Sequence, residues 1–122
     1  MPIKKILVVD DSPTERHVLS EMLIKAGYEV VTCDSGEEAV AQSKTVLPDL
    51  ILMDVVMPGL NGFQATRVIA RDEATKHIPV IICTTKSQET DKIWGLRQGA
   101  RDYIVKPIVA SDLLEKITRL GG

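Results

Sequence analysis

Residues that can take part in metal or phosphoryl chemistry follow the apolar segments of this chain of 122 residues. Asp10 and Asp11 come directly after the first apolar run, and Asp54 comes directly after the third. Thr84 follows the fourth run, and Lys106 follows the fifth. Each side chain taken alone fits an ordinary turn, helix cap or exposed loop. Together they predict a site that contains three carboxylates, an ammonium and a hydroxyl.

The charges of this predicted site indicate its chemistry. Three neighbouring carboxylates repel one another unless a cation lies among them or their pKa values rise. Mg²⁺ suits them, because it binds oxygen ligands and takes one or two carboxylates while it keeps several waters. A lysine beside them is explained if an anion also binds, because a phosphoryl group needs a metal, an ammonium and a hydroxyl donor around its oxygens. Asp54 is then the candidate nucleophile, and Asp10 and Asp11 are the candidate metal ligands.

These side chains meet only if the segments before them form one parallel sheet. Three of the five apolar runs, "ILVV", "LILM" and "VII", are continuous, which is typical of strands buried on both faces. Segments with helical spacing alternate with the runs, so the sequence predicts an α/β fold with right-handed crossovers. Ligands of such sheets bind at the carboxyl ends of the strands. The predicted strands are Ile6–Val9, Val30–Cys33, Leu50–Met53, Pro79–Cys83 and Tyr103–Val105.

The helices between these strands carry their own start and stop signals. Ser12 is the predicted cap of the first helix, and Glu15 three residues later completes the pattern of a capping box. Gly27 and Gly99 follow the ends of the first and fourth helices. The predicted helices are Pro13–Ala26, Gly36–Val46, Asn61–Arg71, Ser87–Gln98 and Ser111–Leu120. No repeat or linker divides the chain, so we expect one domain over residues 1–122.

Composition and charge exclude several classes of function. The net charge is −2 and both signs are interspersed, which argues against nucleic-acid binding. No run approaches the roughly 18 apolar residues of a membrane span, and no signal-peptide pattern opens the chain, so we expect a soluble, cytoplasmic protein. Cys33 and Cys83 lie in apolar runs and are predicted to be small buried hydrophobes rather than disulfide or metal ligands.

Over its whole length the sequence resembles the receiver domains of two-component response regulators, the CheY-like family. The segments "DD", "LILMDVVMPGLNG", "T" and "KP" stand in the family's order and spacing. The resemblance implies a flavodoxin-like, doubly wound sheet of five parallel strands in the order 2-1-3-4-5 with five helices. Because five strands and five helices account for the chain, we expect a receiver without an output domain.

The resemblance also implies a role for each matching residue at the site. Asp54 matches the phosphoacceptor, and Asp10 and Asp11 match the acidic pair that binds Mg²⁺, for which Mn²⁺ can substitute. Val56 lies two residues past the acceptor, where the family offers a backbone carbonyl to the metal. Lys106 matches the phosphate-binding lysine. The implied activity is self-catalysed phosphotransfer and slow autodephosphorylation rather than turnover of a substrate.

Further matches concern signalling after phosphorylation. Thr84 matches the hydroxyl of the family's switch, Tyr103 matches its aromatic residue, and Pro107 matches the position of a cis peptide bond. In receivers the surface of the fourth helix, fifth strand and fifth helix changes on phosphorylation. Trp94 on the predicted fourth helix has polar neighbours three and four residues away, so we predict that it is exposed as an aromatic anchor for a partner.

The fourth helix carries two further expectations. Ile93 and Leu96 are its natural core-facing residues, which leaves Trp94 on an outward stripe. With the loop before it, this helix resembles the stand-alone receivers of type IV pilus chemosensory systems, the PilH-like proteins of twitching motility. The implied partners are a chemosensory histidine kinase and a motor or regulatory protein, or the chain acts as a phosphate sink. We expect a monomer.

Three residues depart from the common receiver pattern. Thr85 stands where the family usually has alanine, and its larger side chain is expected to crowd the entrance to the phosphoryl group. Val56 and Lys86 occupy the two positions that influence how water reaches the acyl phosphate. Neither side chain acts as a base, so the sequence leaves the lifetime of the phosphorylated state open.

Four alternatives remain at this stage. The first is a receiver of another chemotaxis-type pathway. A flavin-binding flavodoxin-like protein needs an uncharged, hydroxyl-rich loop where this chain has "DDSPTER". A hydrolase of the haloacid dehalogenase type needs a second aspartate where this chain has Val56. A purely structural scaffold leaves the convergent charges unexplained.

Overall fold

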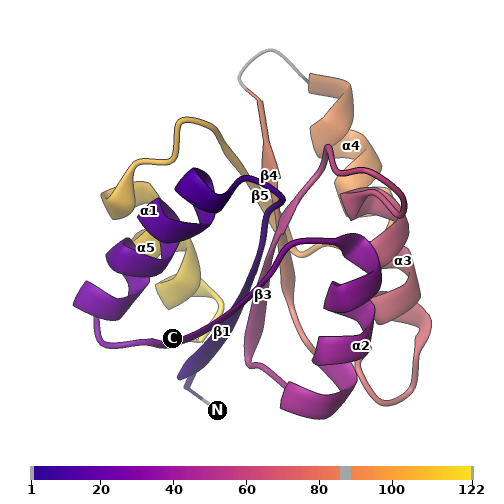
Figure 1. Cartoon of the computed structure of the whole chain (residues 1–122), viewed down its shortest axis with the longest axis horizontal. Coiled ribbons are helices and arrows are strands. Elements are labelled where there is room, and N and C mark those ends of the chain that lie inside the picture. The colour runs from indigo at the N-terminus through magenta and orange to yellow at the C-terminus, as the bar shows by residue number, and fades with distance from the viewer. Residues whose placement is uncertain (1, 86–88, 122) are drawn as a thin grey trace.

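The strands form a single parallel sheet in the order β2-β1-β3-β4-β5 (Figure 1). The computed structural model describes residues 2–85 and 89–121. Each strand pairs only with strands that run in its own direction, and β1 lies between β2 and β3. The predicted order of the sheet is therefore confirmed. The strands are β1 (Lys5–Val9), β2 (Glu29–Cys33), β3 (Leu50–Asp54), β4 (Val80–Thr84) and β5 (Asp102–Val105).

The helices cover both faces of this sheet. One layer contains α1 and α5, and the other contains α2, α3 and α4 (Figure 1). The strand order therefore changes direction between the neighbouring strands β1 and β3. In sheets of this kind, ligands bind at the carboxyl ends of the strands beside this reversal. The helices are α1 (Pro13–Lys25), α2 (Gly36–Val46), α3 (Gly62–Arg71), α4 (Glu89–Arg97) and α5 (Ala110–Arg119).

The apolar core lies on both sides of the sheet. All residues of β3 and β4 are buried, as their continuous apolar sequences predict. Alternate residues of each strand point to opposite faces, so Leu50 and Leu52 contribute to the cluster under α1 and α5, whereas Ile51 and Met53 contribute to the cluster under α2 and α3. The central strands thereby hold their last residues in fixed positions.

Polar side chains cap the helices that begin beside the carboxyl ends of the strands. The Ser12 side chain accepts a hydrogen bond from the Glu15 amide, and Ser35 caps α2 in the same way. Asn61 and Gln64 form a complete capping box at the start of α3. The box predicted for α1 is only half formed, because the Ser12 amide donates to Asp10 Oδ1 and not to the Glu15 carboxylate.

The predicted orientation of α4 is wrong. Ile93 is 54% exposed and Leu96 is 47% exposed, so neither faces the core. Among residues 93–97, the part of α4 whose burial is described, Gly95 is the buried one, and a Cβ atom added to it would lie 2.9 Å from Ile82 Cγ1. Successive helical residues are about 100° apart, so contact through Gly95 turns its neighbours outward. Trp94, 52% exposed, is outward as predicted.

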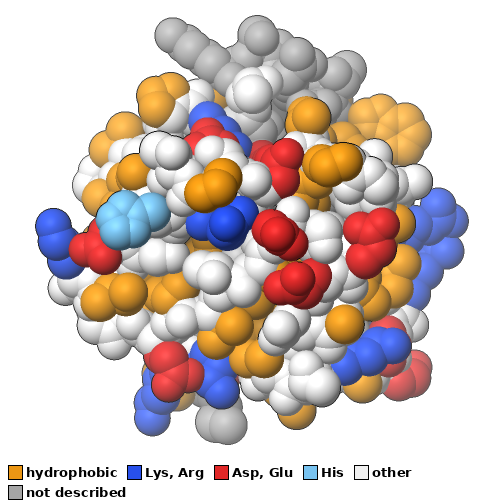
Figure 2. Space-filling view, viewed as in Figure 1, with side chains coloured by type: hydrophobic (Ala, Val, Ile, Leu, Met, Phe, Trp, Pro, Cys, Tyr) orange, Lys and Arg blue, Asp and Glu red, His pale blue; other side chains and the backbone are white. Residues whose placement is uncertain are grey.

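Charged side chains of both signs are interspersed over the face of the molecule shown in Figure 2. No helix of the described ranges 2–85 and 89–121 combines the length and apolar character needed to cross a membrane. Cys33 and Cys83 are both buried and free, as expected. Burial comes first among the causes that raise the pKa of each thiol to about 12, so both are protonated at neutral pH.

Candidate functional site

The predicted site residues lie together at the carboxyl edge of the sheet. Asp54 is the last residue of β3 and is 7% exposed, and Asp10 follows β1 and is 1% exposed. Thr84 ends β4, and its carbonyl accepts a hydrogen bond from the Lys106 amide over 2.7 Å. The Lys106–Pro107 peptide bond that follows is cis, as expected. The register of the strands therefore brings Asp54, Thr84 and Lys106 side by side.

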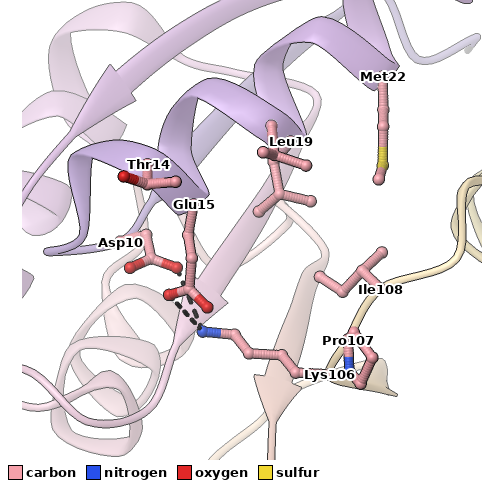
Figure 3. Close-up of a pocket in the computed structure, with 9 residues that line it drawn as sticks. Asp10, Thr14, Glu15, Leu19, Met22, Lys106, Pro107 and Ile108 are labelled. Carbon is pink, nitrogen blue, oxygen red and sulfur yellow. Dashed lines mark hydrogen bonds and ion pairs between the residues drawn. The ribbon is translucent and has the colours of Figure 1, made fainter.

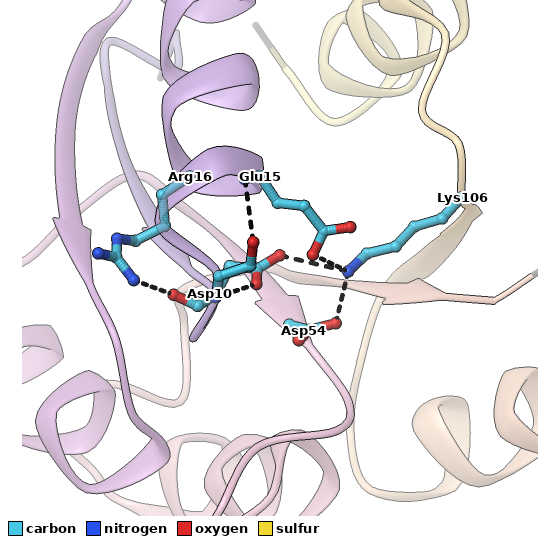
Figure 4. Close-up of polar contacts among 6 residues, drawn as sticks. Asp10, Glu15, Arg16, Asp54 and Lys106 are labelled. Atoms are coloured by element: carbon cyan, nitrogen blue, oxygen red, sulfur yellow. Dashed lines mark hydrogen bonds and ion pairs between the residues drawn. The ribbon is translucent and has the colours of Figure 1, made fainter.

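The Lys106 ammonium is the centre of the polar contacts (Figure 4). Its Nζ donates to Asp54 Oδ1 over 2.8 Å and to Asp10 Oδ2 over 3.2 Å. A third contact, also 3.2 Å long, joins it to Glu15 Oε2. A lysine ammonium has three hydrogens to donate, and each of them has a carboxylate partner here.

Asp10 is held in place from two directions. Its Oδ1 accepts the Ser12 amide over 2.9 Å, and its backbone carbonyl accepts Arg16 Nη1 over 2.7 Å. Both contacts come from the start of α1, which fixes the loop between β1 and that helix (Figure 4). Asp10 therefore presents its remaining carboxylate oxygen towards Lys106.

Three carboxylates could hold a metal ion. Asp10, Asp11 and Asp54 each offer an oxygen, and these oxygens lie within 4.8 Å of one another. Hard oxygen ligands in this number fit Mg²⁺. Val56 is 75% exposed and lines the same hollow of about 340 Å³ as Asp11 and Asp54. The donor set therefore fits the metal that the sequence predicted.

Burial and charge shift two pKa values at the site. Burial raises the pKa of Asp54 and outweighs the contact with Lys106, which lowers it. Burial also opposes the charge on Lys106, but the hydrogen bond to Asp54 and the charges of Asp54 and Asp10 outweigh it and raise the pKa of Lys106. Lys106 is thus an ammonium at neutral pH, and burial makes the charged form of Asp54 costly in free energy.

Thr84 and Tyr103 occupy adjacent strands. The Thr84 hydroxyl is buried and has no hydrogen-bond partner among the described residues. Tyr103 is half-buried on β5, where it pairs in register with Ile82, and the Lys116 ammonium lies 5.2 Å from the centre of its ring. Thr84 therefore has an unused donor at the same strand edge as Asp54, and Tyr103 lies on the neighbouring strand.

Sequence reasoning missed two residues that shape the site. A Cβ atom at Gly62 would lie 2.0 Å from the backbone oxygen of Asp54, so only glycine lets α3 start this close to β3. The "NG" at the start of the predicted third helix is the signal for this position. Glu15 is predicted only as part of a helix cap, and no signal in the sequence pairs it with Lys106.

Two of the three departures from the receiver pattern can be placed. Thr85 is exposed and lines the same hollow as Val56 and Asp54, which agrees with its expected position at the entrance. Lys86 and the predicted start of the fourth helix at Ser87 lie outside the described residues.

Comparison with known families identifies the arrangement. Residues 6–118 match the model of the response regulator receiver domain. The chain belongs to this family. Its sequence is 57% identical to protein PilH of Pseudomonas aeruginosa over 113 residues, which cover 93% of each chain. The receiver also spans about half the length of further curated relatives that are transcriptional regulators.

Solved structures of receivers share the fold. The chemotaxis protein CheY4 of Vibrio cholerae superposes with a TM-score of 0.88 at 35% identity, covering 96% of this chain and 98% of that one. The receiver domain of a sensor histidine kinase of Pseudomonas aeruginosa PAO1 gives 0.88 at 34% identity, covers 95% of both chains and has a magnesium ion in its active-site cleft. Family membership argues against the flavin-binding and hydrolase alternatives.

Proposed function

We propose that this receiver accepts a phosphoryl group on Asp54 from a histidine kinase in a Mg²⁺-dependent reaction. The observation that carries the proposal is the contact of 2.8 Å between Lys106 Nζ and Asp54 Oδ1, beside a cluster of three carboxylates. A buried carboxylate, a metal site and an ammonium at one strand edge are the parts that phosphoryl transfer needs.

In this proposal each residue has a defined task. Asp11 and Asp54 would hold Mg²⁺ directly, Asp10 through water, and Val56 through its backbone carbonyl. The metal would supply positive charge to neutralise the transferring oxygens. An Asp54 oxygen forms the new P–O bond while the P–N bond to the donor histidine breaks and its electron pair stays on the imidazole. Lys106 binds one phosphoryl oxygen, and the Thr84 hydroxyl donates to another.

Phosphorylation is proposed to act on the surface formed by α4, β5 and α5. Thr84 moves towards the phosphoryl group, and Tyr103 enters the space that it leaves. Trp94, half exposed on α4, is the proposed anchor for a partner. Its exposed neighbours Ile93 and Leu96 widen the apolar surface around it.

We place the protein in a type IV pilus chemosensory system as a stand-alone, monomeric, cytoplasmic receiver. The identity of 57% to PilH, over 93% of both chains, supports this placement. The proposed partners are the kinase of that system and a motor or regulatory protein. Alternatively, the receiver acts as a phosphate sink for that kinase. The likeness to CheY4 supports a second candidate, a receiver of another chemotaxis-type pathway.

Mass spectrometry after incubation with acetyl phosphate and Mg²⁺ tests the proposal. The wild type should gain the mass of one phosphoryl group, and slow loss of that mass would measure autodephosphorylation. Asp54→Asn should gain none, whereas Asp34→Asn, which alters an acidic residue after β2, should label like the wild type. Labelling that persists in Asp54→Asn would refute the assignment of the acceptor.

A further inference from the structure

Glu15 lies between two hollows at the mouth of the site. On one side is the hollow that contains Asp54 and Val56. On the other is an apolar hollow of about 210 Å³ between α1 and the segment after β5, with Leu19, Met22 and Ile108 in its wall (Figure 3). Any phosphodonor that reaches Lys106 from this side passes the Glu15 carboxylate.

The local geometry explains why this carboxylate faces the site. In a complete capping box Glu15 would accept the Ser12 amide. That amide instead donates to Asp10 Oδ1 over 2.9 Å, so the Glu15 side chain is free of the helix start. It extends to Lys106 Nζ, 3.2 Å away (Figure 4).

An incoming phosphoryl oxygen must displace one of the three carboxylates bound to Lys106, because the ammonium has no further hydrogen to donate. The side chains of Asp10 and Asp54 are 1% and 10% exposed, and Asp10 is fixed by a second bond. The Glu15 side chain is 48% exposed, and Lys106 is the one residue of the described ranges that it binds. Glu15 is therefore the ligand that leaves.

We propose that Glu15 is a specificity-determining residue that disfavours small, multiply charged phosphodonors. The inference rests on the proposed function, since it concerns the donor of the same reaction. A dianion that approaches Lys106 is repelled by Glu15 more strongly than a monoanion is, because the energy scales with the product of the charges.

Two small donors of different charge provide the test. Acetyl phosphate is a dianion at neutral pH, and phosphoramidate carries one net negative charge. Rate constants of labelling should be measured at Mg²⁺ concentrations that saturate each variant. Glu15→Gln should raise the ratio of the acetyl phosphate to the phosphoramidate rate constant about threefold at low ionic strength. The increase should shrink with added salt, because salt screens exposed charges.

Glu21→Gln is the matched control. Glu21 is exposed on the same helix, so the substitution changes net charge equally but lies away from Lys106. Its ratio should equal that of the wild type. The inference would be overturned if this ratio rose equally in both variants, or if it did not rise in Glu15→Gln. In either case, normal labelling of the proteins would still uphold the proposed function. If neither donor labels any of the three proteins, the proposed function fails and the inference falls with it.

A second measurement, without metal or donor, tests the contact itself. Glu15→Gln should lower the urea concentration at the unfolding midpoint when Lys106 is present. In a Lys106→Met background the same substitution should lower that midpoint less. Equal shifts in the two backgrounds would mean that Glu15 and Lys106 are not coupled, which would overturn the proposed role.

Discussion

At the scale of single residues, Asp54 is a carboxylate in an unfavourable environment that one lysine makes tolerable. Its pKa is raised, chiefly by burial, so the folded state binds the proton more tightly than the unfolded state does. The stability that this proton provides is fully present below the ordinary pKa of aspartate and is lost as the pH rises through the folded pKa. A neutral asparagine in its place carries no such cost, and Lys106 keeps two other partners.

We therefore predict that Asp54→Asn raises the free energy of unfolding of the metal-free protein at neutral pH, with a difference that disappears in acid. Urea unfolding in a chelator at several pH values measures it. Asp49→Asn is a control of opposite sign: backbone hydrogen bonds from Lys5 and Lys4 lower the pKa of Asp49, so its contribution is lost as the pH falls. Equal pH profiles for wild type and Asp54→Asn would contradict the prediction.

A second prediction at this scale concerns the metal. Asp11 is the exposed member of the carboxylate cluster. The hydrogen bond that fixes the Asp10 carboxylate does not involve Asp11, so the Asp11 side chain can orient towards a cation. Asp11→Asn should weaken Mg²⁺ binding at least tenfold, because losing a group that merely orients a metal ligand already costs about 10- to 100-fold. Calorimetry should find a smaller loss for Asp10→Asn, since Asp10 is proposed to act through water. Undiminished affinity in Asp11→Asn would exclude it as a direct ligand.

At the scale of elements, the sequence predicts strands from their apolar patterns. It does not predict features that depend on a single side-chain contact. The continuous apolar runs predict the sheet, and parallel strands necessarily bring Asp54 and Lys106 to one edge. The Glu15–Lys106 contact could not be predicted, because it arises only when Asp10 takes the Ser12 amide. The orientation of α4 was missed for a similar reason, since contact through Gly95 outweighs the apolar character of Ile93 and Leu96.

This outward orientation leads to a prediction for α4. Trp94→Ala should leave folding and phosphorylation unchanged and weaken partner binding by about 2 kcal/mol, the scale of a hot-spot truncation. Ile24→Ala is the matched control, because Ile24 is 54% exposed but lies on α1, which covers the other face of the sheet. Calorimetry would use the partner that the beryllofluoride-bound wild type retains from a cell lysate. Equal affinity of Trp94→Ala and wild type would reject the anchor.

At the scale of the whole molecule, the site and the proposed partner surface are connected through neighbouring strands. Thr84 on β4 pairs with Val105 on β5, two residues from Tyr103. A phosphoryl group shifts the balance between two arrangements only by the contacts that differ between them. The Thr84 hydroxyl has no partner among the described residues. In the proposed function it would supply such a contact, because a phosphoryl group on Asp54 would offer it an acceptor oxygen.

We therefore predict that Thr84→Ala separates phosphorylation from response. The resting protein loses no hydrogen bond from this hydroxyl to any described residue, so the free energy of unfolding should change by no more than about 1 kcal/mol. Asp54 should still be labelled, but beryllofluoride should no longer alter hydrogen exchange in α4 and β5. Thr84→Ser, which keeps the hydroxyl, should retain part of the change. A full response in Thr84→Ala would show that another group couples the phosphoryl site to Tyr103.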